Sequence, residues 1–223
     1  MQINIGGVTP LSTIDYPGRL AAVIYTQGCN FRCLYCHNYR LVEKRETPFT
    51  QDQLQAFLEA RRRIIDGVVV SGGEPTIHKD LPSFCAWLKE MGLAVKLDTN
   101  GTNPLMLRLL IEKRLVDFIA MDIKAPWEKY SRIIQKDFPV EIIKECLQLI
   151  KESKIACEFR TTVHSALLTL EDLEKIIDIV GPGYSLVFQI CNPTPKYNVQ
   201  NTYTKEKLLN FISNKQGFHI EVR

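Results

Sequence analysis

The sequence predicts an α/β fold, a partial (β/α)6 barrel with parallel strands. The first observation is that apolar, strand-like runs alternate with helix-like segments along the chain, a pattern that favours a parallel sheet with right-handed crossovers. The second is the length of 223 residues, because a closed eight-unit barrel usually needs roughly 250 residues. We therefore expect an incomplete barrel and a single domain over residues 1–223.

The expected strands are short apolar runs. Val68, Val69 and Val70 form a continuous apolar stretch, which is typical of a strand that is covered on both faces. The six strands that the pattern predicts are residues 20–26, 67–71, 93–98, 116–123, 156–163 and 185–190.

Helix signals separate these strands. Thr50 is a suitable N-cap for a helix whose apolar residues recur at helical spacing. Gly92 is a typical residue just after the end of a helix. The predicted helices are residues 51–64, 81–91, 104–114, 127–134, 140–151, 170–180 and 204–214.

The two ends of the chain lie outside this alternation. Residues 1–19 are rich in turn formers and predict a hairpin or loop, and residues 193–223 predict a C-terminal extension with a short strand at 218–222. Neither a signal peptide nor an apolar run of about 18 residues is recognised, so we expect a cytoplasmic protein without a membrane partner. The net charge of +3 is too small to indicate nucleic-acid binding.

The densest chemical signal is a group of three cysteines at the spacing C-x3-C-x2-C, namely Cys29, Cys33 and Cys36. Thiolates this close along the chain can converge on one inorganic centre. A zinc site would need a fourth ligand at a similar spacing, and none is evident. An iron–sulfur cluster held by three cysteines would leave one iron open. A non-catalytic iron–sulfur or zinc protein remains an alternative. Cys85 and Cys146 lie on expected helices and are predicted to be small buried residues.

Polar motifs follow several expected strands, at the ends where parallel barrels bind ligands. Gly72 and Gly73 lack a Cβ, so the backbone can approach a ligand closely, and the Glu74 carboxylate beside them can face an ammonium group. The alternative is an ordinary turn. Asp98 ends another strand, in a sequence that also suits a helix N-cap or a turn.

Three charged residues complete this set. Asp122 and Lys124 are two residues apart and share one face of their strand, so they can contact a ligand or form a structural ion pair. The Arg160 guanidinium suits a carboxylate or a ribose hydroxyl.

The stretch from Gln27 to Asn38, with an aromatic residue before the last cysteine, resembles the signature of the radical S-adenosylmethionine (SAM) superfamily. It resembles in particular the activating enzymes of glycyl-radical enzymes. The resemblance implies a [4Fe–4S] cluster on the three cysteines, with SAM bound to the fourth iron. Because residues 38–66 contain no cysteine, we expect only one cluster.

The resemblance also implies SAM-binding roles. Lys124 would contact the SAM carboxylate, and Asp98 and Asp122 would hold a monovalent cation beside it. Gln189 stands where the pyruvate formate-lyase activase has a histidine. The SAM-binding residues implied in this way are Tyr35, His37, Gly72, Gly73, Glu74, Asp98, Asp122, Lys124, Arg160 and Gln189. Tyr35 and His37 would pack against the adenine.

The implied reaction is reductive cleavage of SAM, with an electron from a flavodoxin- or ferredoxin-type reductant. The resulting 5′-deoxyadenosyl radical would take a hydrogen atom from a glycine of a partner glycyl-radical enzyme. Because the cofactors carry this chemistry, no side chain is expected to be a catalytic acid or base.

The partner that we expect is the anaerobic ribonucleoside-triphosphate reductase. Three features favour it over pyruvate formate-lyase: the compact length, the absence of a histidine after the sixth strand, and residues 12–19. This last segment resembles the Asp-x-Pro-Gly segment of the activases, and it argues against the other alternative, a radical SAM enzyme that acts on a small molecule.

Overall fold

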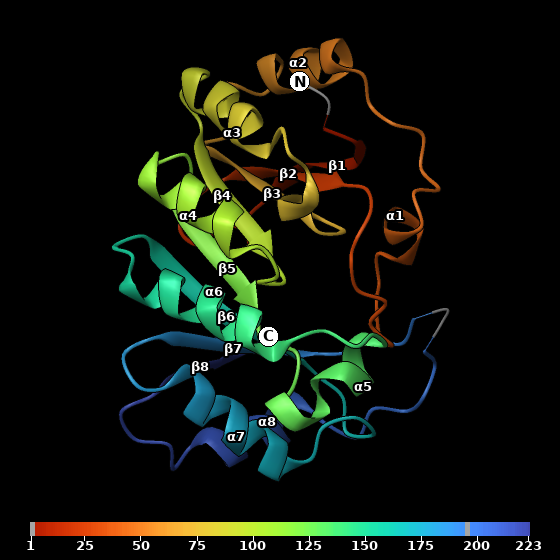
Figure 1. Ribbon diagram of the computed structural model, residues 1–223, viewed down its shortest axis with the longest axis vertical. Coiled ribbons are helices and arrows are strands. Elements are labelled where there is room, and N and C mark those ends of the chain that lie inside the picture. Colours follow the sequence, from red (N-terminus) through yellow and green to blue (C-terminus); the bar gives the residue numbers. More distant parts are fainter. Residues whose placement is uncertain (1–2, 195–196) are drawn as a thin grey trace. The chain divides into compact units, whose positions relative to one another are not determined.

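The computed structural model describes residues 3–194 and 197–223 (Figure 1). The chain divides into two compact units. The first unit comprises the chain up to Asn30, Asn38–Ile119 and Ile142–Ala156, and the second comprises Phe31–His37, Ala120–Glu141 and Cys157–Arg223. The expectation of a single domain over the whole chain stays a prediction.

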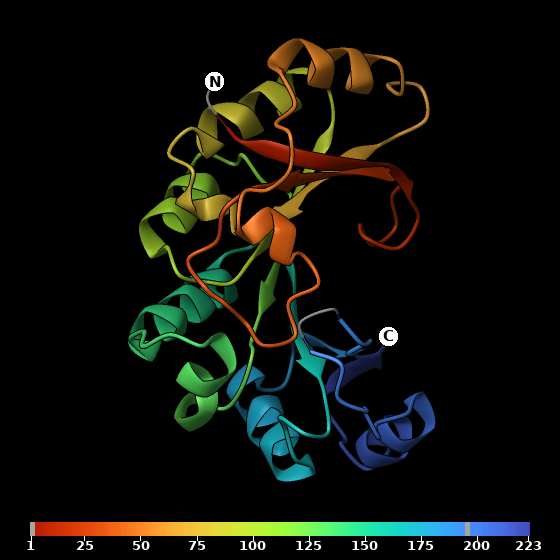
Figure 2. The ribbon, with the colours of Figure 1, turned by 90° about the vertical axis from the view of Figure 1, so that its right-hand side faces the viewer.

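The sheet of the first unit begins with an antiparallel hairpin. Strand β1 (Ile5–Ser12) pairs with β2 (Ala21–Thr26), which Figure 2 shows in red. Strand β2 pairs in parallel with β3 (Gly67–Gly72), and β3 pairs in parallel with β4 (Ala94–Thr99). The segment predicted as a hairpin or loop therefore contributes a strand of its own.

The register of the parallel pair β2–β3 aligns the ends of these two strands. Thr26, the last residue of β2, lies opposite Gly72, the last residue of β3. Since β2 leads towards the cysteines and β3 ends in the glycine pair, these two motifs leave the sheet at neighbouring points. Strand β3 lies in the interior, because Val68, Val69 and Val70 are fully buried.

The helices predicted in the first unit are present and differ from the prediction at their ends, whereas the short α1 and η1 were not predicted. Thr50 caps α2 in a capping box with Gln53. Helix α2 ends at Glu59 rather than at residue 64, because the chain tightens into turns in which the Ile64 amide bonds to the Arg61 carbonyl at 2.8 Å. The helical elements here are α1 (Tyr39–Val42), α2 (Gln51–Glu59), η1 (Pro75–Ile77), α3 (Leu81–Glu90), α4 (Pro104–Glu112) and most of α6 (Val140–Glu152).

Strand β5 (Phe118–Asp122) leads from the first unit into the second. In the second unit, β6 (Ala156–Val163), β7 (Ser185–Ile190) and β8 (His219–Val222) pair in parallel. The segment predicted as one helix over residues 127–134 begins as a 3-10 turn. The helical elements are η2 (Trp127–Lys129), α5 (Tyr130–Ile134), α7 (Leu170–Val180) and α8 (Lys205–Ile212).

The strands follow one another in the order of the chain, from β1 to β8. The predicted α/β class with parallel strands is thus confirmed: β8 corresponds to the short strand expected at residues 218–222, and β1 is added to the expected strands. Cys85 and Cys146 are fully buried on α3 and α6, as predicted. None of the helices in residues 3–194 and 197–223 combines the length and the apolar character that a membrane crossing requires.

Candidate active site

The three clustered cysteines lie in the irregular segment that follows β2. Cys29 belongs to the first unit, whereas Cys33 and Cys36 belong to the second. The Cys36 amide donates to the Cys33 carbonyl at 3.2 Å, so these two residues flank one tight turn. All seven cysteines of the chain are described, and all are thiols rather than disulfides.

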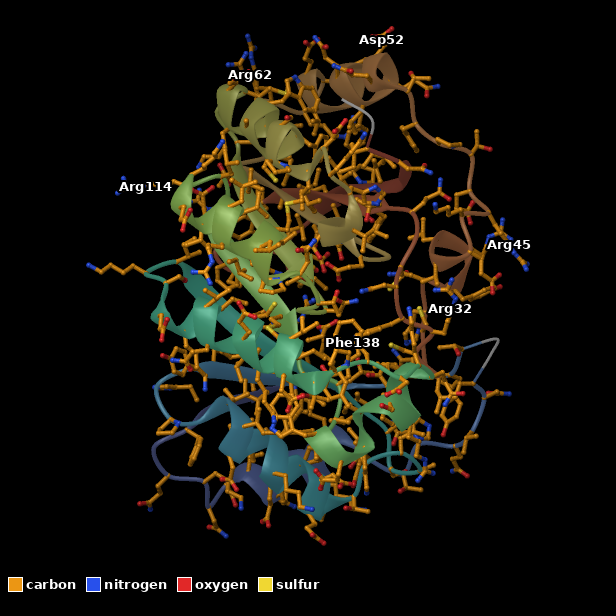
Figure 3. The ribbon with its side chains drawn as sticks, viewed as in Figure 1. Arg32, Arg45, Asp52, Arg62, Arg114 and Phe138 are labelled. Carbon is orange, nitrogen blue, oxygen red and sulfur yellow. The ribbon has the colours of Figure 1, made fainter. Side chains whose placement is uncertain are left out.

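Residues 31–37 are fixed on α5 within the second unit. The Arg32 amide donates to the Ile134 carbonyl at 3.0 Å. The buried Phe31 ring packs edge-on against Phe138, with 5.4 Å between the ring centroids; Arg32 and Phe138 are labelled in Figure 3. Backbone and ring contacts therefore hold this part of the cysteine segment in place.

The donor set fits an iron–sulfur cluster in its chemistry, because all three cysteines are thiols. Within the described residues, no three His, Cys, Asp or Glu side chains converge closely enough to hold a metal ion. Burial raises the pKa of the Cys33 thiol, while the Lys124 ammonium acts in the opposite direction and favours the thiolate. Because cluster ligands are thiolates, Lys124 favours the form of Cys33 that binds iron.

The glycine pair at the end of β3 makes close backbone contacts. The Gly73 amide donates to the Thr26 carbonyl at 2.9 Å, and the Glu74 amide donates to the Gly28 carbonyl at 2.9 Å. A Cβ on Gly73 would overlap the Gly28 carbonyl, and a Cβ on Gly72 would overlap the backbone of Thr26. Glycine is therefore required here so that the cysteine segment and the end of β3 can meet.

Glu74 is buried and holds the neighbouring turns together. Its Oε1 accepts from the Thr76 amide at 3.1 Å, from Thr76 Oγ1 at 2.5 Å and from Thr99 Oγ1 at 2.7 Å. Its Oε2 accepts from the Asn100 amide at 2.7 Å. Burial raises the pKa of this carboxyl, and the hydrogen bonds only partly oppose that effect.

An amide network that sequence reasoning missed reaches the first cysteine. Asn100 Nδ2 donates to Asn30 Oδ1 at 2.9 Å and lies 3.9 Å from Cys29 Sγ. Asn30 Nδ2 donates in turn to Thr102 Oγ1 at 2.7 Å. These contacts join loops that are about seventy residues apart in the sequence, and the only sequence signal was the run of turn-forming residues after β4.

Asp98 is held on both sides within the first unit. Its Oδ2 accepts from Ser71 Oγ at 3.0 Å, and its Oδ1 lies 3.0 Å from Lys96 Nζ. Lys96 was not among the predicted site residues. The signal for it was present, because Lys96 and Asp98 are two residues apart and share one face of β4.

In the second unit, Asp122 lies between two cations. Its Oδ2 is 3.1 Å from Lys124 Nζ, and its Oδ1 accepts from Arg160 Nε at 3.0 Å. Burial alone would raise the pKa of Asp122, but Lys124 and Arg160 more than offset it, so the pKa is lowered. The pKa of Lys124 is raised well above its usual range, because the Asp122 carboxylate outweighs the effect of burial.

The remaining predicted residues also lie in the second unit. Tyr35 is buried, and its hydroxyl has no hydrogen-bond partner in the described part of the chain. Burial raises the pKa of this phenol. His37 is exposed. Gln189 is half-buried near the end of β7, opposite Thr162. An orphaned hydroxyl inside the protein suits a site that accepts a polar ligand.

The predicted residues therefore form two groups, one in each unit. The first unit contains Cys29 and the residues at or just after the ends of β3 and β4, and the second contains the other two cysteines and the ion pairs of Asp122. The first group is Cys29, Gly72, Gly73, Glu74 and Asp98, and the second is Cys33, Tyr35, Cys36, His37, Asp122, Lys124, Arg160 and Gln189.

Comparison with known proteins places this chain in a family. The model of the radical SAM superfamily matches residues 23–180. Streptococcus suis SuiB, solved with S-adenosylmethionine, aligns with a TM-score of 0.67 over 90% of this chain and 49% of its own, at 13% identity. The structure described as anSMEcpe with bound AdoMet aligns with a TM-score of 0.62 over 88% of this chain and 61% of its own, at 19% identity. The chain belongs to the radical SAM superfamily, and the predicted partial barrel is confirmed.

The relatives narrow the family further. MJ1227 of Methanocaldococcus jannaschii, whose name marks it as a candidate glycyl-radical enzyme activating enzyme, is 36% identical over 89% of this chain and 84% of its own. The pyruvate formate-lyase-activating enzyme of Staphylococcus aureus is 36% identical over 54% of this chain and 53% of its own. The protein is thus a radical SAM enzyme of the activase type, and the cofactors of this family are a [4Fe–4S] cluster and SAM.

Proposed function

We propose that this protein generates a glycyl radical on the anaerobic ribonucleoside-triphosphate reductase. The observation that carries the proposal is the position of Lys124, whose ammonium pairs with Asp122 and acts electrostatically on the Cys33 thiol. A cation beside a cluster ligand suits the carboxylate of SAM bound at the open iron. When bound, the cluster and SAM supply reductive cleavage and the 5′-deoxyadenosyl radical that abstracts hydrogen.

The glycine pair recognises the SAM ammonium through its backbone. The four hydrogen bonds that Glu74 accepts come from the protein itself, so the carboxylate braces the turn. The Gly73 carbonyl can then accept from an ammonium group close to the backbone, and the Gly72 carbonyl, which accepts from Asn38 Nδ2 at 3.3 Å, can share this role. This assignment keeps Glu74 in the site as a support rather than as the direct contact.

The second unit supplies the contacts to the rest of SAM. Lys124 binds the carboxylate, and Arg160, fixed by Asp122, faces the same carboxylate or the ribose. Tyr35 and His37 pack against the adenine, and Gln189 takes the place of the histidine found in the pyruvate formate-lyase activase. Residues 31–37 are anchored by their backbone, so these contacts are oriented before SAM arrives.

A monovalent cation beside the SAM carboxylate is part of the proposal. Asp98 and Asp122 are its expected ligands. Each of these carboxylates already pairs with a side-chain cation, Lys96 for Asp98 and Lys124 with Arg160 for Asp122. A metal cation therefore has to share these oxygens with the protein's own ammonium and guanidinium groups.

A protein partner fits the exposed apolar residues at the end of β1 and on the segment that follows it. Leu11, near the end of β1, is 46% exposed, and Ile14, between β1 and β2, is 77% exposed. Apolar side chains on the surface gain free energy when a partner protein covers them. The resemblance of residues 12–19 to the activases and the glutamine at position 189 favour the reductase over pyruvate formate-lyase. A flavodoxin- or ferredoxin-type protein supplies the electron.

The test is an anaerobic reaction of the reduced, reconstituted protein with SAM and each candidate partner. We expect a glycyl-radical doublet by EPR with the reductase and none with pyruvate formate-lyase. The Ile14→Asp variant should lower the radical yield while SAM cleavage without partner is unchanged, and Leu105→Asp, at a site that is 78% exposed on α4, is the matched control. Radical formation only on pyruvate formate-lyase, or a modified small molecule in place of any radical, would refute the proposal.

A further inference from the structure

Lys96 is a lysine in the interior of the first unit. It lies in the middle of β4 and only 1% of its surface is exposed. Lysine is almost never fully buried unless a partner balances its charge. A buried lysine that no sequence motif explains therefore needs a structural or functional reason.

The Lys96 ammonium contacts two different parts of the first unit. It donates to the Asp15 backbone carbonyl at 2.7 Å, and it lies 3.0 Å from Asp98 Oδ1. The Phe118 ring adds a cation–π contact, with 5.6 Å between the ammonium nitrogen and the ring centroid. An ammonium group has three hydrogens to donate, so one side chain can hold the carbonyl and the carboxylate at the same time.

The carbonyl that Lys96 contacts is itself well fixed. Ser12 Oγ donates to Asp15 Oδ2 at 2.5 Å and accepts from the Asp15 amide at 3.1 Å. The next residue, Tyr16, is 3% exposed and packs in an apolar cluster with Val23 and Val69. Lys96 therefore joins a rigid point of the segment between β1 and β2 to the carboxylate of Asp98.

On the Asp98 side, both carboxylate oxygens have a partner. Ser71 Oγ donates to Oδ2 at 3.0 Å, and Lys96 holds Oδ1. One contact from the neighbouring strand β3 and one from β4 itself fix the rotamer of a side chain that could otherwise turn. The serine supplies a neutral hydrogen bond, whereas the lysine supplies an ion pair.

We propose that Lys96 is a positioning residue for SAM binding, which fixes the orientation of the Asp98 carboxylate and couples it to the segment between β1 and β2. The inference rests on the proposed role of Asp98 in the site. It gives that carboxylate a support inside its own unit. It also links residues 12–19, where a protein partner is proposed to bind, to Asp98, which is proposed to bind a cation beside SAM.

The first part of the test is a double-mutant cycle on SAM affinity. Wild type, Lys96→Met, Asp98→Asn and the double variant are reconstituted, and the dissociation constant of SAM is measured by anaerobic titration. We expect each single variant to bind SAM about tenfold more weakly, as loss of one charge-assisted contact implies. The double variant should bind no more weakly than Asp98→Asn, because Lys96 acts through Asp98.

Two further measurements separate positioning from support of the fold. Lys96→Arg keeps the charge and should bind SAM within about threefold of wild type. Hydrogen exchange of the cofactor-free protein should quicken at the amides of residues 13–16 and 18 in Lys96→Met but not in Asp98→Asn, since only the lysine contacts the Asp15 carbonyl. Iron and sulfide content should be unchanged in every variant.

Additive losses in the double variant, or wild-type SAM affinity in Asp98→Asn, would overturn the inference even where the wild-type protein cleaves SAM and activates its partner. If Lys96→Met does not fold, the comparison of Lys96→Arg with Asp98→Asn still decides: equal tenfold losses in the two would also overturn it. Failure of the wild-type protein to cleave SAM would instead remove the proposed function on which the inference rests.

Discussion

The two units each hold a carboxylate near a strand end, and the two behave oppositely. Glu74 in the first unit accepts hydrogen bonds only from hydroxyl and amide groups in the contacts described above, and burial raises its pKa. Asp122 in the second unit is paired with Lys124 and Arg160, and its pKa is lowered in spite of burial. Neutral donors thus fail to offset desolvation, whereas two cations more than offset it.

The difference assigns different tasks to the two regions. Glu74 ties the turn after β3 to the turn after β4, so it shapes the backbone around the glycine pair. Asp122 fixes the positions of a lysine and an arginine, so it shapes the charge that a ligand meets. Each prediction that follows changes one side of this comparison and leaves the other intact.

The largest effect, loss of SAM cleavage, should follow from replacing a cluster cysteine in either unit. Cys29→Ala in the first unit and Cys33→Ala in the second should each abolish SAM cleavage, because a cluster held by three thiolates needs all of them. The measurement is 5′-deoxyadenosine formed under reducing, anaerobic conditions. Cys85→Ala, at a fully buried thiol on α3, is the control and should keep its activity. Full turnover by either cluster variant would contradict the assignment of the metal ligands.

The second effect concerns stability and the first unit. Glu74→Ala leaves two backbone amides and two hydroxyls without their acceptor and should lower the free energy of unfolding by about 3 kcal/mol. Urea denaturation of the cofactor-free protein measures it. Glu59→Ala, at an exposed position on α2, should change stability by no more than about 0.5 kcal/mol. Equal effects of the two variants would show that the bracing role is absent.

The third effect concerns the ligand and the second unit. Lys124→Ala should weaken SAM binding about ten- to a hundredfold with little change in iron content, because it removes a charge-assisted contact of about 1.5–3 kcal/mol. Anaerobic titration gives the dissociation constant. Lys175→Ala removes a lysine from an exposed ion pair with Glu128 on the same unit and should bind SAM like wild type. An unchanged constant in Lys124→Ala would make the Asp122 pair purely structural.

The smallest effect concerns pH: the contributions of Asp122 and Glu74 to the free energy of unfolding should change in opposite directions as the pH rises. The folded pKa of Asp122 lies below its ordinary value of 3.8, so its contribution to stability is present above that pH and is lost as pH falls through the folded pKa. The folded pKa of Glu74 lies above its ordinary value of 4.5. Its contribution is present below pH 4.5 and is lost as pH rises through the folded pKa.

Unfolding of the cofactor-free protein at a series of pH values tests this contrast. Relative to wild type, Asp122→Asn should remove a loss of stability on acidification, and Glu74→Gln should remove a loss of stability on raising the pH. Changes of the same sign in the two variants would refute the comparison.

Sequence patterns predicted the elements whose signals are local. The strand Ala156–Val163 and the helix Leu170–Val180 have the predicted bounds. Their periodicity, and Gly181 as the residue that ends the helix, can be recognised from neighbouring residues in the sequence. Helix α1 was missed, since its four residues are too few to show a period.

The site was predictable where it rests on motifs and not where it rests on long-range contacts. The ion pair of Asp122 with Lys124 follows from their spacing, and the same spacing in Lys96 and Asp98 was overlooked because the lysine precedes the acid, deeper in the strand. The turn-forming residues after β4 do not reveal that Asn100 bonds to Asn30, since folding alone brings those two loops together.

The close contact between Gly73 and Gly28 restricts which sequences this fold can accept. At Gly73 any added carbon meets the backbone of another loop, which cannot turn away as a side chain can. At Gly92, by contrast, an added carbon meets nothing within 4 Å, and only the positive φ of 79° disfavours other residues. Among random variants, position 92 should therefore accept asparagine and similar residues, whereas position 73 should return only glycine. A scan of mutational tolerance should therefore detect this part of the site as a position that accepts only glycine.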